Sequence, residues 1–171
     1  MTTSTTTPAP EAAEKFATLI ADIRIAMMTT IAADGSLHTR PMAVQREPTL
    51  DELWFFTSVD SAKADEIDSA HQVSLGFADP KRSVYVAIAG TGRIVKDEAK
   101  ARELWNPWVE VWFPNGPSDP ALRLVQVTPH RAEYWDGSSS RVSMLFEAAK
   151  AALGVRPSQP DTDHAQIDLP R

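Results

Sequence analysis

The stretch from Ser36 to Ser69, SLHTRPMAVQREPTLDELWFFTSVDSAKADEIDS, decides the fold of this chain. Its pattern predicts two strands, a turn rich in hydroxyl groups and the start of a helix near Ala62. The unpaired N–H groups and the positive dipole end of that helix would face the turn. The polar side chains of the stretch suit a phosphate group, and they are Arg40, Thr57, Ser58, Ser61 and Lys63. We therefore expect an anion site between a sheet and a helix.

A purely structural interpretation of the same residues is open at this point. Serine is a common N-cap in helices that bind no ligand, so Ser61 could simply cap the helix. Lys63 could equally be a solvated surface lysine. Short motifs match by chance often enough that the neighbouring segments must decide between the two interpretations.

The neighbouring segments predict an antiparallel barrel. Asp34-Gly35 is a dipeptide that favours a tight hairpin turn between two strands. Pro41 has no N–H to donate, so we expect its strand at an edge or a bulge, and Gly90 and Gly92 mark a second irregularity. Successive strands joined by short turns favour a barrel over a βαβ sheet. The strands are expected over 23–33, 37–45, 53–57, 73–78, 83–89, 91–95, 123–127 and 132–135, and the helices over 11–22, 62–69, 98–105 and 142–153.

A tryptophan-rich segment follows the helix that Asp97 is expected to cap. It places Trp105, Trp108, Trp112 and Phe113 close together in the sequence WNPWVEVWFPNGP. Such a cluster is typical of a core or a subunit interface, and less often of a surface that stacks on a planar cofactor. We therefore expect these side chains to be covered, either within the chain or by a partner.

Composition limits the possible functions. The formal net charge of −6 argues against general nucleic-acid binding, which needs a basic face. The sequence has no cysteine, so disulfides, thiol chemistry and thiolate metal sites are excluded, and electron transfer would need a bound cofactor. No histidine and carboxylate spacing indicates a metal site.

Length and end sequences predict one domain with two tails. The 171 residues suffice for a single core, which we expect over 11–154. Residues 1–10 are expected to be a disordered tail and 155–171 a mostly disordered one. The start lacks the features of a secretory signal, and no apolar run approaches the roughly 18 residues that span a membrane. We expect a cytoplasmic protein without a membrane partner.

Several motifs occur in the order in which one known family has them. The Asp34-Gly35 hairpin, TRPMAV, WFFTSVDSAK, VSLGF and GTGRI resemble the pyridoxamine 5'-phosphate oxidase-like family of FMN-binding split barrels. LWNPWVEVWFPNGP and EYWDG are similar to the general stress protein 26 branch of that family. The resemblance covers about residues 11–154. It implies a mainly β fold with flanking helices, an antiparallel split β-barrel, and a homodimer with FMN at the subunit interface.

The resemblance also implies the residues that contact FMN. The flavin ring would lie along Arg40, Pro41, Met42, Ala43 and Val44, the ribityl chain and phosphate along Phe56, Thr57 and Ser58, and the phosphate would be held by Ser61 and Lys63. Tyr85 falls where the family's oxidases commonly place a glutamine against the ring, and Trp135 near a tryptophan that they supply from the other subunit. Ala62 stands where the oxidases have an arginine, so the phosphate would depend more on Arg40, hydroxyls and backbone.

The activity that the resemblance implies is FMN-dependent oxidoreduction, related to stress, with two-electron flavin chemistry on an unidentified small substrate or electron donor. Pyridoxamine 5'-phosphate oxidation is not expected, because no Tyr, Arg and Ser set occurs over 105–119, where Glu110 is the only charged residue before Asp119. No residue is assigned as catalytic acid or base, since the four histidines are scattered. A non-catalytic flavin-binding or sensor protein is one alternative, and a relative that binds F420 or haem is another.

Overall fold

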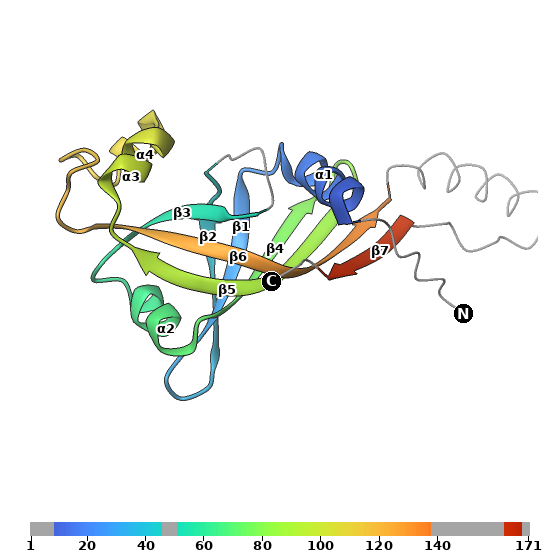
Figure 1. Ribbon diagram of the computed structural model, residues 1–171, viewed down its shortest axis with the longest axis horizontal. Coiled ribbons are helices and arrows are strands. Elements are labelled where there is room, and N and C mark those ends of the chain that lie inside the picture. Colours follow the sequence, from blue (N-terminus) through green and yellow to red (C-terminus); the bar gives the residue numbers. More distant parts are fainter. Residues whose placement is uncertain (1–8, 46–50, 138–162, 169–171) are drawn as a thin grey trace, which may run out of the picture.

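The structure is a computed structural model, and it describes residues 9–45, 51–137 and 163–168 (Figure 1). The strands form one sheet in the order β2-β1-β4-β5-β6-β3, with β7 paired to β6, and every pairing is antiparallel. The strands are β1 (Ile25–Ile31), β2 (Leu37–Ala43), β3 (Leu53–Ser58), β4 (Gln72–Asp79), β5 (Val84–Val95), β6 (Leu122–Asp136) and β7 (Asp163–Asp168). The helices are α1 (Ala9–Ile20), α2 (Ala62–Ala70), α3 (Glu98–Leu104) and α4 (Pro107–Glu110).

The sheet curls so that its two end strands meet. The backbone N–H of Gln45, just beyond β2, donates to the carbonyl oxygen of Trp54 in β3 at 3.1 Å. Because β2 and β3 stand at opposite ends of the strand order, this bridge turns the open sheet into a half-barrel. The predicted antiparallel split barrel is confirmed.

The predicted hairpin and the predicted edge strand are both present. Gly35 has a φ of 82°, a conformation that glycine adopts at little cost, and its N–H donates to the Ala32 carbonyl at 2.9 Å. Pro41 lies in β2, which is the end strand of the sheet and pairs only with β1 among the named strands. The missing N–H of proline is tolerated at such an edge.

At two places where we expected two separate strands, the structure has a single long strand. Residues 83–89 and 91–95 were expected as two strands with an irregularity at Gly90 and Gly92 between them; the irregularity is present as a bulge between Ala89 and Gly90, but β5 continues through it as one strand. Residues 123–135 form the single strand β6, in which Pro129 lies opposite Gly90. A local irregularity bends a strand in a strongly curled sheet without ending it, and this is why these breaks were predicted wrongly.

One apolar core fills the barrel. It includes Phe55, Leu75, Ile88 and Val125, all fully or nearly fully buried. The expected apolar stripe of α1 covers one end of this core, where Phe16 packs edge-on against Tyr134 with ring centroids 5.2 Å apart.

The C-terminal segment contains one strand that we did not predict. Residues 155–171 were expected to be mostly disordered, but Asp163–Asp168 form β7, which pairs along the last part of β6. Only two apolar residues, Ala165 and Ile167, alternate with polar ones in this segment, and the edge of β6 supplies its hydrogen-bond partners. The helix expected over 142–153 lies outside the described residues. Within the described part of the chain, no helix has the length and apolar character that crossing a membrane requires.

Gly90 gives the first testable prediction. A Cβ atom at this position would lie 2.5 Å from the Thr128 carbonyl oxygen, a backbone atom that cannot move aside easily. Gly90→Ala should therefore lower the free energy of unfolding by about 1–3 kcal/mol, measured by urea denaturation. Gly76→Ala is the matched control, because a Cβ there would approach nothing closer than 3.9 Å. Equal stability of the two variants would contradict the close approach of β5 and β6 at the bulge.

Candidate functional site

A cleft of about 1580 Å³ opens beside the closed end of the barrel. Its walls come from the end of α1, from β2 and β3, from the start of α2 and from the segment that contains α3 and α4. Most of the predicted site residues line it, namely Pro41, Met42, Ala43, Val44, Phe56, Thr57, Ser58, Ser61 and Lys63. The structure thus brings together two segments that the sequence predicted as one site.

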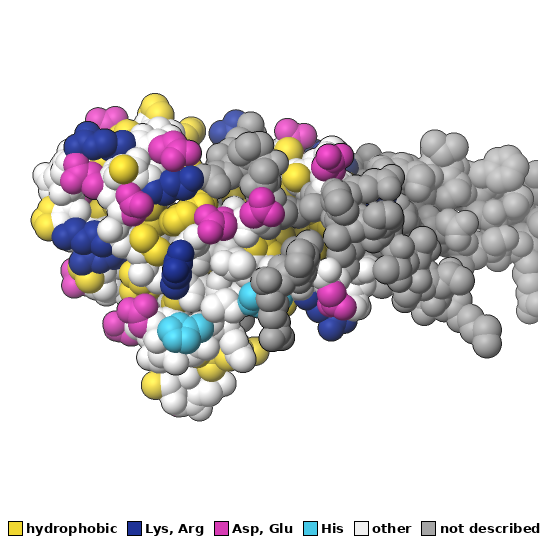
Figure 2. Space-filling view, viewed as in Figure 1, with side chains coloured by type: hydrophobic (Ala, Val, Ile, Leu, Met, Phe, Trp, Pro, Cys, Tyr) yellow, Lys and Arg dark blue, Asp and Glu magenta, His cyan; other side chains and the backbone are white. Residues whose placement is uncertain are grey.

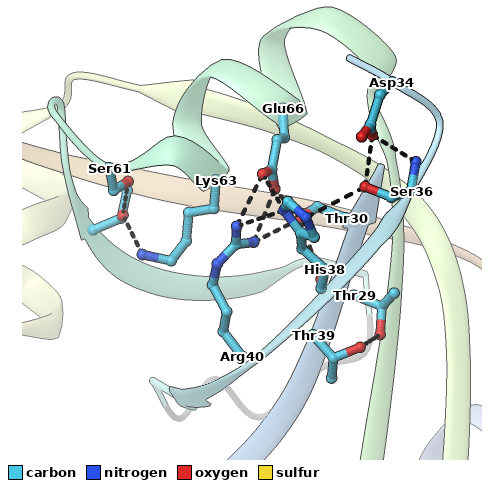
Figure 3. A network of polar contacts seen from close by, with 11 residues as sticks. Thr29, Thr30, Asp34, Ser36, His38, Thr39, Arg40, Ser61, Lys63 and Glu66 are labelled. Atoms are coloured by element: carbon cyan, nitrogen blue, oxygen red, sulfur yellow. Dashed lines mark hydrogen bonds and ion pairs between the residues drawn. The ribbon is translucent and has the colours of Figure 1, made fainter. Parts of the chain in front are cut away.

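The polar part of the cleft is a lysine–hydroxyl cluster formed by Thr57, Ser61 and Lys63 (Figure 3). The Thr57 and Ser61 hydroxyl oxygens lie 2.8 Å apart, and the Lys63 ammonium donates to Thr57 Oγ1 at 3.2 Å. Ser61 is the N-cap residue of α2, but its side chain makes no capping hydrogen bond. The purely structural interpretation of Ser61 is therefore insufficient, because its hydroxyl points to Thr57 instead.

Lys63 carries a positive charge that the described residues leave without a carboxylate partner. No carboxylate of the described residues lies within 4 Å of its ammonium, which donates a hydrogen bond to the neutral hydroxyl of Thr57. Partial burial, followed by repulsion from Arg40, lowers the pKa of Lys63, while Glu66 acts in the opposite direction. A lowered pKa means that the charged form of Lys63 is destabilised, and an anion bound beside the ammonium would stabilise that form. The position therefore favours an anionic ligand.

Arg40 differs from the prediction. We expected its guanidinium to grip a phosphate, but Arg40 does not line the cleft and forms a bidentate ion pair with Glu66 of α2. Arg40 Nη1 lies 2.8 Å from Glu66 Oε2, and Nη2 lies 2.9 Å from Oε1. In Figure 3 Arg40 reaches toward Glu66, whereas the Lys63 chain extends toward Ser61. The fork that suits a phosphate is thus occupied by a carboxylate.

Glu66 is the residue that our sequence reasoning missed. It is 8% exposed and also contacts the Thr30 hydroxyl and His38 Nδ1, the latter at 2.8 Å. The hydrogen bonds from Arg40 outweigh burial and lower the pKa of Glu66 from 4.5 to about 2. A signal was available, because Glu66 lies between the apolar Ala64 and Ile67 in the predicted helix, and an inward-facing carboxylate needs a cation.

Tyr85 and Trp135 lie outside the walls of the cleft in this single chain. They are direct partners in the register of β5 and β6, and Tyr85 is 45% exposed. The structure therefore brings these two residues to each other and does not bring them to the other predicted site residues. Their expected contact with a cofactor stays a prediction that depends on a partner subunit.

The tryptophan-rich segment is only partly buried. Trp105 packs edge-on against Phe56 with centroids 5.9 Å apart, and it belongs with Phe113 to a small cluster around Trp54 and Leu104. Trp108 and Trp112, by contrast, are 75% and 80% exposed and line the cleft, so they are not covered within the chain, and cover by a partner subunit stays a prediction. The four-residue helix α4 is too short to have a buried face for both.

Comparison with known proteins agrees with the fold. The family model described as pyridoxamine 5'-phosphate oxidase like matches residues 11–159. This match spans every strand of the half-barrel except β7, together with all segments that line the cleft.

Three similar proteins illustrate the range of relatives. The general stress FMN/FAD binding protein of Xanthomonas citri is 31% identical, with a TM-score of 0.65 over 74% of this chain and 89% of that chain. A general stress protein 26 homologue from Jannaschia has a TM-score of 0.71 at 22% identity, over 90% of this chain and 96% of its own, and shows the shared fold. Protein bli-3 of Neurospora crassa is 26% identical over 145 residues, which cover 79% of this chain and 69% of bli-3.

Proposed function

The chain belongs to the pyridoxamine 5'-phosphate oxidase-like family, and we propose that it is a flavoprotein that binds flavin mononucleotide in the cleft for two-electron oxidoreduction of a small substrate. The observation that carries the proposal is the lysine–hydroxyl cluster at the start of α2, at the polar end of an otherwise largely apolar cleft. The name of the Xanthomonas citri relative, an FMN/FAD binding protein, supports a flavin as the ligand. Its description as a general stress protein supports a role in stress.

The lysine–hydroxyl cluster fits one phosphate group. Lys63 supplies one charge, Thr57 and Ser61 supply hydroxyl donors, and the first N–H groups of the nine-residue helix α2 face the same end of the cleft. A single cation with two hydroxyls suits the monophosphate of FMN better than the pyrophosphate of a dinucleotide. Arg40 would not bind the phosphate itself, because its guanidinium is paired with Glu66. It would act only through the residues that it contacts.

The apolar walls suit the ring of a flavin. Pro41, Met42, Ala43 and Val44 line one side, and Phe56 lies on β3 between them and the phosphate end. These residues would exclude water from the ring and orient it along the edge strand β2. Bound FMN would supply reversible two-electron chemistry, which no side chain of this cysteine-free sequence offers.

The cleft does not support pyridoxamine 5'-phosphate as the substrate. A second phosphate would need a second group of cations, but Lys63 and Arg24 are the basic residues among those that line the cleft. The α3–α4 side of the cleft carries Glu103 and Asp119 instead. A substrate phosphate on that side would meet negative charge.

We also propose that two chains form a homodimer with the cofactor near their contact. The outer face of the β1–β2 hairpin exposes Ile25 and Met27, which are 49% and 45% exposed and lie opposite Ala43 and Pro41. This flat apolar strip reaches the cleft, because Ile25, Pro41 and Ala43 also line it. A second copy packed on the strip would cover it and could bring Tyr85 and Trp135 to the cofactor of its neighbour.

Native mass spectrometry of the purified protein tests both proposals. We expect a species of two 18.8-kDa chains with two bound FMN molecules, and release of FMN on denaturation. FAD, F420, haem or no ligand in the released fraction would overturn the assignment of FMN. A monomer that retains FMN would overturn the dimer alone.

Anaerobic mixing with NADH or NADPH then separates an enzyme from a passive binder. Loss of the absorbance band of oxidised flavin is expected for an oxidoreductase that accepts electrons from a nicotinamide. A flavin that stays oxidised with both donors, and also with a small set of thiols and quinols, would favour the flavin-binding or sensor alternative.

A further inference from the structure

The short helix α4 and the turn that follows it present two large aromatic side chains at the cleft. Trp108 and Trp112 are 75% and 80% exposed, and both line the cleft wall. Exposed tryptophan side chains have a large apolar area in contact with water, and clusters of them mark binding surfaces more often than scattered single residues do. Figure 2 shows hydrophobic side chains gathered in a band beside the α3–α4 end of the molecule, with both acidic and basic side chains along it.

The position of α4 is fixed by a contact with the closed end of the barrel. The Asn106 side-chain oxygen accepts hydrogen bonds from the N–H groups of Trp108 and Val109, at 3.1 and 3.3 Å. The Asn106 side-chain nitrogen donates to Gln45 Oε1 at 2.8 Å. Gln45 is 6% exposed and is also the residue that bridges β2 to β3. The two tryptophans are therefore held on a rigid support rather than on a loose loop.

The charges around these tryptophans favour a cation. Glu110 lies between them in the chain, and Glu103 and Asp119 line the same side of the cleft. Glu103 forms an exposed ion pair with Lys100 at 3.4 Å, and Asp119 accepts hydrogen bonds from the Asn115 side chain and from the Ala121 N–H. Aromatic faces and carboxylates both attract positive charge.

We propose that Trp108 and Trp112 form a platform on which a planar aromatic cation stacks beside the flavin. Planar aromatic cations are therefore the class of molecule that the cleft accepts. Glu103 and Asp119 line the cleft on the side of the platform, whereas the lysine–hydroxyl cluster is positively charged. One cleft would therefore hold an anionic group at one end and a cationic ring at the other. The inference rests on the proposed function in taking the cleft as the flavin site. Binding to the platform itself can be measured whether or not flavin is present.

Isothermal calorimetry with three bicyclic probes of similar shape tests the platform on the protein as purified. N-methylquinolinium carries a positive charge, quinoline is neutral at pH 8, and naphthalene-2-sulfonate is negative. We expect affinity to decrease in that order. Trp108→Leu combined with Trp112→Leu should weaken N-methylquinolinium binding about tenfold. Glu103→Gln, at a carboxylate that lines the cleft, should weaken the binding of the cation and leave that of quinoline unchanged.

Val111→Ser is the control, because Val111 is 76% exposed on the same segment but does not line the cleft. It should bind N-methylquinolinium like the parent protein, and all variants should keep the parent melting temperature. Equal affinity for the three probes, or unchanged affinity in the double variant, would overturn the proposal. Absence of binding with any probe would also overturn it, and sedimentation would then show whether a second copy covers the tryptophans. Cation binding to a protein without FMN would reject the proposed function and keep the platform.

Discussion

Replacing Lys63 and Thr57 together by alanine is expected to weaken FMN binding by about 3–6 kcal/mol, or roughly 10²- to 10⁴-fold. Each side chain would make a charge-assisted hydrogen bond to the phosphate, and such bonds contribute about 1.5–3 kcal/mol each. Lys63 has no carboxylate partner among the described residues that could offset its loss. Fluorescence titration of the cofactor-free protein with FMN measures the change.

Riboflavin gives this experiment its internal control. It has the same ring as FMN but no phosphate, so the double variant should bind riboflavin with the affinity of the parent protein. Lys81→Ala is the matched variant for charge, because Lys81 lies on the turn after β4, away from the cleft walls. An unchanged ratio of FMN to riboflavin affinity in the double variant would show that the phosphate lies elsewhere.

The parts of the fold that could be predicted depend on local pattern. The hairpin at Gly35, the helix that starts after Ser61 and the apolar stripe of α1 each follow from a few adjacent residues, and all three are present. The continuity of β5 through Gly90 could not be predicted in this way. A bulge and a break have the same local sequence signal, and the partner strand β6 decides between them.

The sequence could predict which residues lie near the site, but not which side chains pair with one another there. The cluster of Thr57, Ser61 and Lys63 forms within one strand–turn–helix unit, so the sequence places its members together. Arg40 reaches the same region from β2, and its partner is decided by Glu66, which is 26 positions later in the chain. Whether Arg40 pairs with a bound phosphate or with a carboxylate depends on which inward-facing group lies nearest to it in the folded chain. The periodicity of the sequence contains no information about this distance.

Replacing Arg40 by methionine is expected to lower the free energy of unfolding by about 3–5 kcal/mol at neutral pH. Methionine keeps much of the apolar volume of arginine but removes both donors to Glu66, which would leave a carboxylate that is 8% exposed without its cation. Urea denaturation measures the loss. Arg102→Met is the control, since its ion pair with Glu98 is exposed on both sides and should contribute less than about 1 kcal/mol.

The pKa of Glu66 determines how the stability loss in Arg40→Met changes with pH. In the parent protein the pKa of Glu66 is lowered from 4.5 to about 2, so the ion pair contributes its full stability above pH 4.5 and loses it as the pH falls toward 2. In Arg40→Met the largest cause of the lowering is gone, while the hydrogen bonds from Thr30 and His38 still act against burial, so the pKa of Glu66 is higher than in the parent protein. Glu66 is then protonated at a higher pH in the variant than in the parent protein, so the stability deficit of the variant should shrink as the pH falls from 7 toward 2. A deficit that stays constant over this range would contradict an uncompensated Glu66 charge as its cause.

The double variant Arg40→Met/Glu66→Met decides whether Arg40 also serves the cofactor. Removing both partners of a buried ion pair is close to neutral for stability when the replacements pack well, so most of the deficit of Arg40→Met should be recovered. FMN affinity should match that of the parent protein, because Arg40 does not line the cleft and its guanidinium is held by Glu66. A well-folded double variant with FMN affinity weakened by about 1.5–3 kcal/mol and unchanged riboflavin affinity would show instead that Arg40 leaves Glu66 to bind the phosphate.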